Sequence, residues 1–240
     1  MEEPPSTSGG IKRAIPQEFQ DKMDETAAKL PRVTATPAVL NDNQKRHLIV
    51  GVCLHSVISP ALRKYVIPIL TPLYEELTLK QKIDTQTYST RLKQYQPTKT
   101  FLNYDAVNNN KALYGYQSAQ YDYTIKSVVD LSKLFLQTHM AQYTGFDETC
   151  DFSALFGLII NIDKFPAVVK SNAKDVRDKV RNQWAHCDFT NWDAVKYSDS
   201  FQLMTNLVKN LCLSSNEENQ TLLELKKWEI IGNKLITMSS

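Results

Sequence analysis

The chain has 240 residues, 42% of them hydrophobic, so it is long enough to bury one large core or two small ones. Its 28 Lys and Arg residues against 26 Asp and Glu give a formal net charge of +2, which predicts no strong general attraction to nucleic acid. No run approaches the roughly 20 apolar residues of a membrane helix, no glycine-rich phosphate loop occurs, and the four cysteines lack the spacing of a disulfide framework or a zinc site.

Residues 1–40 hold five of the ten prolines and no sustained apolar period, so we expect a flexible N-terminal arm with at most one short helix, over about 17–29. The first ten residues are acidic and rich in Pro and Ser, unlike a secretory signal. We therefore expect a cytosolic or nuclear protein, with the cytoplasm as the preferred location and no membrane association. Because phosphate loops and zinc-site spacing are missing from the sequence, we also expect no metal and no cofactor. Apolar periodicity begins at Asp42, and we predict one helical domain over residues 41–236.

The first part of this domain has the pattern of consecutive helices. Asn41 or Asp42 is placed to cap the first of them. Pro68 and Pro72 should kink or divide the helix that contains them, because proline lacks the backbone donor of a helix interior. The predicted helices run over about 42–58, onward from Pro60, and over about 73–82.

Residues 83–123 contain seven of the eleven tyrosines, the run Asn108–Asn110 and no clear helical period. A structureless loop of this length is unusual inside a compact domain, so we expect an ordered insertion, with a short helix or a hairpin. Packing of the tyrosines over the helices is the preferred interpretation. Stacking on RNA bases is the alternative, since Lys and Arg residues are interleaved with the tyrosines.

The second half has the apolar periodicity of buried helices, with no internal repeat and no alternation of strands with helices. Asp151 and Asn172 are predicted helix caps, and Gly232 is placed just beyond the last helix. The predicted helices cover about 125–136, 153–162, 172–187, from Trp192 or Lys196 to 211, and 215–231. The fold class that follows is all-α.

The segment 172–192, NAKDVRDKVRNQWAHCDFTNW, carries the residues with functional chemistry. On a helix with about 100° per residue, five apolar side chains fall on one stripe that should face the core. The stripe consists of Ala173, Val176, Val180, Trp184 and Cys187.

A polar strip lies nearly opposite this stripe. Arg181 and His186 flank it at about 140° to one another, since they are five residues apart. Asn182 is an i,i+4 neighbour of His186, and Ala185 would let another helix approach closely. Two copies meeting across such strips would bring two arginines and two histidines into one cleft. Arginine binds phosphate through a forked pair of hydrogen bonds, and histidine can move a proton near neutral pH, so these groups suffice for attack of an RNA 2′-hydroxyl on its neighbouring phosphate.

The motif RNQWAH at 181–186 resembles the R-polar-x-x-x-H signature of the HEPN superfamily. The flanking sequences DFSALFGLIINIDKFP and HCDFTNWDAVKYSDSFQLM are similar to the animal branch named for a DAZ-interacting RING ubiquitin ligase, over about residues 45–235. The resemblance implies a helical bundle that dimerises, with Arg181 and His186 as the catalytic pair and Asn182 as the polar residue after the arginine. The Tyr-rich insertion is not part of the superfamily's minimal bundle.

The resemblance implies one of two functions. Many family members are metal-independent endoribonucleases, which would make this chain a homodimer that cleaves RNA, leaves 2′,3′-cyclic phosphate ends and spares DNA. Other members have lost activity, so the alternative is a catalytically silent dimerisation or assembly module of a larger signalling or immune protein.

The basic residues of the segment have simpler interpretations as well. Arg181 taken alone would be a surface arginine paired with Asp178 or Asp188, and His186 would be a group that favours a helix end. The family context favours phosphate contact for Arg181, and Asn182 one turn before His186 favours a functional role for the histidine. A solvated face is as good an interpretation as an RNA groove for the other cations, because two aspartates lie among them. The candidate RNA-binding residues are Lys174, Arg177 and Lys179.

Overall fold

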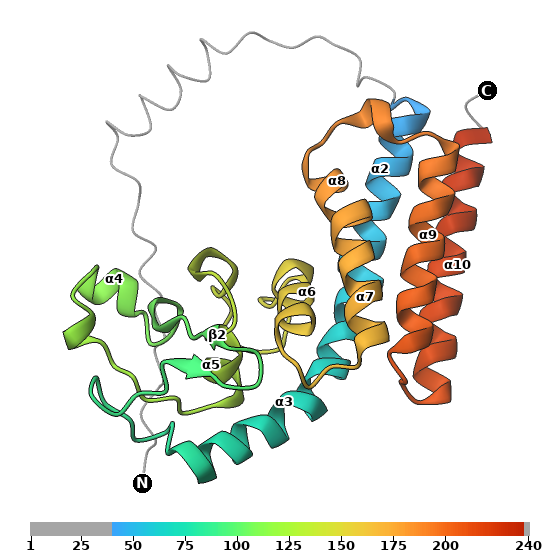
Figure 1. The fold of residues 1–240 in the computed structure, drawn as a ribbon. Coiled ribbons are helices and arrows are strands. Elements are labelled where there is room, and N and C mark those ends of the chain that lie inside the picture. The colour runs from blue at the N-terminus through green and yellow to red at the C-terminus, as the bar shows by residue number, and fades with distance from the viewer. Residues whose placement is uncertain (1–39, 238–240) are drawn as a thin grey trace, which may run out of the picture. The chain divides into compact units, whose positions relative to one another are not determined.

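Helices dominate residues 40–237, the part of the chain that the computed structural model describes (Figure 1). The all-α class is therefore confirmed. The arm predicted over residues 1–40 and its helix over 17–29 lie outside the described residues, apart from Leu40. The longer elements are α2 (Asp42–Cys53), the π-helical turn η1 (Leu54–Ile58), α3 (Ser59–Gln81), α6 (Phe152–Asn161), α7 (Ala167–Val176), the π-helical turn η5 (Arg177–Arg181), α8 (Asn182–Ala185), α9 (Ala194–Asn210) and α10 (Ser215–Thr237).

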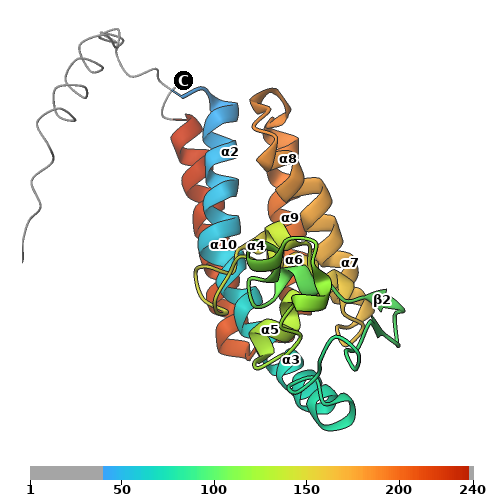
Figure 2. The ribbon, with the colours of Figure 1, turned by 90° about the vertical axis from the view of Figure 1, so that its left-hand side faces the viewer.

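Helices α2, α7, α9 and α10 stand side by side. α2 contacts both α9 and α10, α9 contacts α7, and α6 packs against α3 and α7. Figure 2 shows α2 and α10 at one side of the bundle, with α7 and α9 at the other. The core between them is closed by large, fully buried side chains, which include Trp192, Phe156, Leu54, Leu62 and Leu155.

Side-chain caps fix where three helices begin. Asn41 accepts a hydrogen bond from the amide of Gln44 at 3.0 Å, and the Gln44 side chain accepts one from the amide of Asn41 at 2.9 Å. This reciprocal pair satisfies two of the free amides at the start of α2. Asp151 caps α6 and Asp193 caps α9 in the same sense, each at 2.8 Å. The predicted caps at Asn41 and Asp151 are confirmed.

Of the two outcomes predicted for Pro68 and Pro72, a kinked or a divided helix, the division is wrong. Both residues lie within α3, which runs without interruption from Ser59 to Gln81. Both prolines are exposed, as is Lys64 four residues before Pro68. The carbonyls that lose a donor therefore lie on the solvent side, where water can replace the missing amide.

Three boundaries in the second half also differ from the prediction. Helix α7 begins at Ala167 after Pro166, so Asn172 is inside the helix and donates to the carbonyl of Asn206 at 3.2 Å instead of capping it. Gly232 lies inside α10 instead of beyond its end, and its lack of a β-carbon leaves room for the hydroxyl of Tyr197 on α9. The helix predicted over 125–136 is reduced to the short α5 (Val128–Lys133).

The Tyr-rich segment 83–123 is an ordered insertion, as predicted. Four of its tyrosines, Tyr95, Tyr104, Tyr121 and Tyr123, are buried. The polar side chain of Asn110 is fully buried and exchanges hydrogen bonds with the backbone of Asp122, which explains part of the asparagine run. The elements here and just beyond are β1 (Gln94–Tyr95) paired with β2 (Thr100–Phe101), η2 (Tyr104–Ala106), α4 (Asn110–Tyr114), η3 (Ser118–Gln120), α5 (Val128–Lys133) and η4 (Thr138–Met140).

Candidate functional site

The helix that carries the RNQWAH motif is interrupted by the π-turn η5. Within it the amide of Asn182 donates to the carbonyl of Arg177, five residues earlier. A π-turn holds one residue more than an α-turn and is frequent at functional sites. Ala173, Val176 and Val180 are fully buried, as the helical wheel predicts. The motif begins at the last residue of the turn.

The predicted apolar stripe fails at its end. Cys187 is exposed, because it adopts a left-handed backbone conformation with φ of 53° that ends the helix and turns the chain away from the core. Trp184 is half-buried rather than a full core residue. Its ring packs edge-on against Phe152 and in parallel with His47 of α2. His47 Nε2 lies 2.9 Å from the carbonyl of Trp184, which can only accept, so this nitrogen carries the proton.

Arg181 is held by uncharged partners. The hydroxyl of Ser153 accepts from its Nε at 3.1 Å and from Nη2 at 2.6 Å, and the amide oxygen of Asn182 accepts from Nη1 at 2.9 Å. The two predicted carboxylate partners are engaged elsewhere. Asp178 pairs with Arg177 at 2.8 Å, and Asp188 accepts from its own loop. The positive charge of Arg181 therefore has no carboxylate in contact with it among residues 40–237.

Arg181 lines a pocket of about 160 Å³. Ser153 on the wall is buried, and Arg177 shares the pocket. Segments far apart in the sequence meet here: the turn η4, the start of α6 and the π-turn. The lining residues are His139, Met140, Asp151, Ser153, Arg177 and Arg181. Neither His139 nor Ser153 could be connected with Arg181 from the sequence, because nothing in their spacing shows that these segments meet.

His186 lies outside this pocket. It is exposed at the end of α8, and its amide donates to the carbonyl of Asn182 at 3.2 Å. The amide oxygen of Asn182 is engaged by Arg181. The predicted neighbour of His186 thus orients the arginine in this structure, and the histidine ring is open to a ligand or to another chain.

The structure separates the three candidate RNA-binding residues. Arg177 joins Arg181, whereas Lys174 is exposed on α7. Lys179 pairs with Asp175 at 2.7 Å and lines a different pocket. On that side Lys196 of α9 donates from Nζ to the carbonyl of Lys179 within the π-turn. Burial lowers the pKa of Lys196 below its ordinary value.

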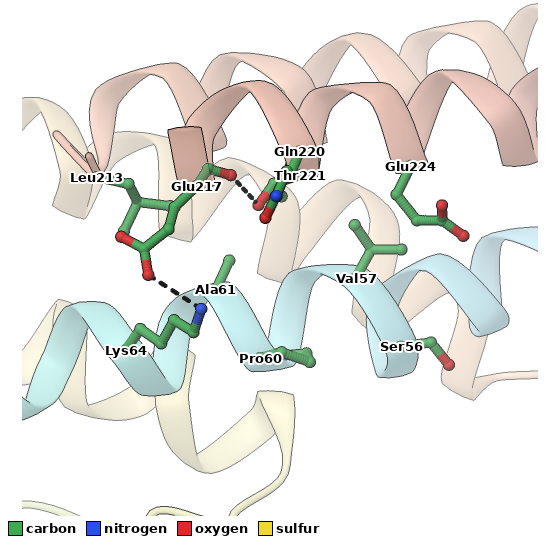
Figure 3. A pocket seen from close by; sticks show the side chains of 10 residues that line it. All are labelled: Ser56, Val57, Pro60, Ala61, Lys64, Leu213, Glu217, Gln220, Thr221 and Glu224. Atoms are coloured by element: carbon green, nitrogen blue, oxygen red, sulfur yellow. Dashed lines mark hydrogen bonds and ion pairs between the residues drawn. The ribbon is translucent and has the colours of Figure 1, made fainter. Parts of the chain in front are cut away.

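A second hollow lies between η1, the start of α3 and α10 (Figure 3). Lys64 forms an ion pair with Glu217 at 3.0 Å across it, and Glu224 adds a second carboxylate. An excess of negative charge does not suit a phosphate, and no His lines the hollow to activate a hydroxyl, so it offers neither an anion site nor a histidine-activated nucleophile.

Over residues 40–237, no group of His, Cys, Asp or Glu side chains is arranged to hold a metal ion. Within the same range, no helix is long and apolar enough to cross a membrane. No protein-family model, curated protein or solved structure matches the chain.

Proposed function

We propose that this chain is a HEPN-type domain that cleaves RNA as a homodimer, without a metal, in the cytoplasm. The observation that carries the proposal is the environment of Arg181. Its guanidinium is fixed by Ser153 and Asn182, which are uncharged, at the mouth of a pocket that Arg177 shares. A guanidinium that is held in place and not neutralised keeps its attraction for phosphate.

The motif residues would divide the reaction between them. Arg181 holds the scissile phosphate and stabilises the negative charge that builds on its oxygens. His186 takes the proton of the 2′-hydroxyl or gives one to the leaving 5′-oxygen. The 2′-oxygen forms a bond to phosphorus as the bond to the 5′-oxygen breaks, which leaves a 2′,3′-cyclic phosphate and a 5′-hydroxyl. DNA lacks the attacking hydroxyl and is spared.

The position of His186 supports a dimer rather than a monomer as the active form. The histidine lies outside the pocket of its own chain and is exposed. Ala185 beside it is also exposed and has a small side chain, which permits close approach of a second helix. A second copy could therefore bring its own His186 toward the phosphate that Arg181 holds.

A silent dimerisation or assembly module is the second candidate function. The hydrogen bonds between Arg181 and Ser153 tie the π-turn to α6, so the arginine also contributes to packing without any reaction. A protein that needs this tie for its fold would keep the arginine even if it cleaved nothing.

The deciding experiment is cleavage of labelled single-stranded RNA in EDTA by the full chain and by Arg181→Ala, His186→Ala and Gln183→Ala. Gln183 is exposed in the same turn and serves as the matched control. We expect cleavage by the wild type and the control only, with cyclic phosphate ends.

Mixing the two inactive variants tests the shared cleft. A mixed dimer keeps one arginine and one histidine, so partial activity should return if both chains serve one cleft. Equal cleavage by all four proteins would refute the assignment of the site. A stable dimer that never cleaves would favour the assembly module.

A further inference from the structure

The pocket in front of Arg181 contains more cationic and polar groups than the motif supplies. We infer that it binds a single phosphate group of RNA within one subunit, with Arg177 and His139 as ligands beside Arg181. This inference rests on the proposed function, since it names how that site holds its substrate. Phosphate binding then belongs to the monomer, and only cleavage needs the second chain.

The size of the pocket selects the group that it can hold. Sites for drug-sized ligands enclose about 300–1,000 Å³. The volume of about 160 Å³ in front of Arg181 is too small for a nucleoside and is suited to a phosphate. The bases and sugars of a bound RNA would therefore lie outside, over the surface of the domain.

The hydrogen-bond inventory of the lining leaves donors for a phosphate. Arg177 pairs with Asp178 through Nε, which leaves the two terminal nitrogens of its guanidinium for a ligand. The hydroxyl of Ser153 accepts twice from Arg181 and can still donate its own proton. His139, on η4, also lines the pocket and is exposed.

One group opposes an anion. Asp151 also lines the pocket, and its carboxylate is needed as the cap of α6, where it accepts from the amide of Ala154 at 2.8 Å. The wall thus carries two guanidinium groups, one of them paired with Asp178, against one carboxylate of its own. Asn caps a helix about as well as Asp does, so Asp151→Asn removes the opposing charge and keeps the cap.

The test is titration of the full chain with inorganic phosphate, followed by NMR of the His139 ring and by calorimetry, at concentrations where the protein is monomeric. We expect saturable binding that weakens about tenfold in Arg177→Gln and several-fold in His139→Gln, because each removes a hydrogen bond to a charged group. Asp151→Asn should bind more tightly than the wild type. Lys209→Gln, which removes an exposed charge on α9, is the control and should bind as the wild type does.

Two results would overturn the inference. One is equal weakening by Arg177→Gln and Lys209→Gln, which would mean unspecific attraction by net charge. The other is the absence of saturable binding at millimolar phosphate. The His186→Ala variant separates this inference from the endoribonuclease proposal. Phosphate binding that is intact in the wild type and in His186→Ala, without RNA cleavage by either, supports the pocket and removes the enzyme. RNA cleavage that is unchanged in Arg177→Gln and His139→Gln supports the enzyme and refutes the pocket as its phosphate site.

Discussion

Gly51 of α2 sits directly under the Trp184 indole, and this contact allows a quantitative test of how the motif is positioned. A β-carbon at residue 51 would lie 2.5 Å from Nε1 of that ring, 2.8 Å from Cε2 and 2.9 Å from Cζ2. Carbon atoms in contact normally stay about 3.5–4.0 Å apart. The ring must therefore move in Gly51→Ala, and it belongs to a residue only two positions before His186.

Two effects of opposite sign determine the stability of Gly51→Ala. Alanine is better than glycine in a helix interior by about 0.8–1.0 kcal/mol. Overpacking a well-filled contact costs about 1–3 kcal/mol. We expect a net loss of about 1 kcal/mol in the free energy of unfolding, measured by urea denaturation.

The same substitution in a Trp184→Leu background should have the opposite sign. Without the indole the added methyl group has room, and only the gain in helix propensity remains. Gly51→Ala should then stabilise the protein by about 1 kcal/mol, so the two substitutions interact by about 2 kcal/mol. Equal destabilisation in both backgrounds would refute the packing of Trp184 on Gly51. Stabilisation in the wild type would mean that the ring is not held there at all.

Three further predictions concern the segment around the motif. Lys196→Met should lower the free energy of unfolding by about 1 kcal/mol in urea, since it removes the hydrogen bond to the carbonyl of Lys179 in the π-turn. Cys187→Gly should raise the melting temperature, because glycine adopts the left-handed conformation there without the cost of about 1 kcal/mol that a side chain brings. Hydrogen bonds from Thr190 lower the pKa of Asp188 below its ordinary value of 3.8, so its contribution to stability is present above that pH and is lost as the pH falls further. Acid unfolding of Asp188→Ala should accordingly depend less on pH in that range, and an unchanged profile would contradict the assignment.

Local patterns were sufficient for much of the fold. The apolar period placed Val176 and Val180 in the core, and Asp151 capped α6 because a side-chain oxygen there meets free amides only a few residues away. Such effects depend on neighbours in sequence. The uninterrupted α3 could not be predicted from Pro68 and Pro72, since the outcome depends on which face of the helix meets water.

The candidate site was only half visible in the sequence. Arg181 and His186 were found through the motif, which is contiguous. Ser153 and His139 were not, because they reach the pocket only when the folded chain brings α6 and η4 to the same hollow as the π-turn. The exposure of Cys187 was not predicted for a related reason. A non-glycine residue adopts a positive φ there, and no local sequence pattern indicates it.

The π-turn makes the alignment of the motif depend on chain length rather than on composition. Deleting one residue between Arg177 and Arg181 could restore a regular α-helix with its hydrogen bonds complete. Because the π-turn holds one residue more than an α-turn, this deletion would leave everything beyond it in nearly the same orientation relative to α6, whereas the same deletion in a regular α-turn would rotate the rest by about 100° and shift it by about 1.5 Å. Asn182 and His186 would keep their neighbours after a deletion within the turn, and would face others after a deletion in α7, although both helices would look intact by circular dichroism. Counting residues along this helix therefore does not measure the angle between its side chains.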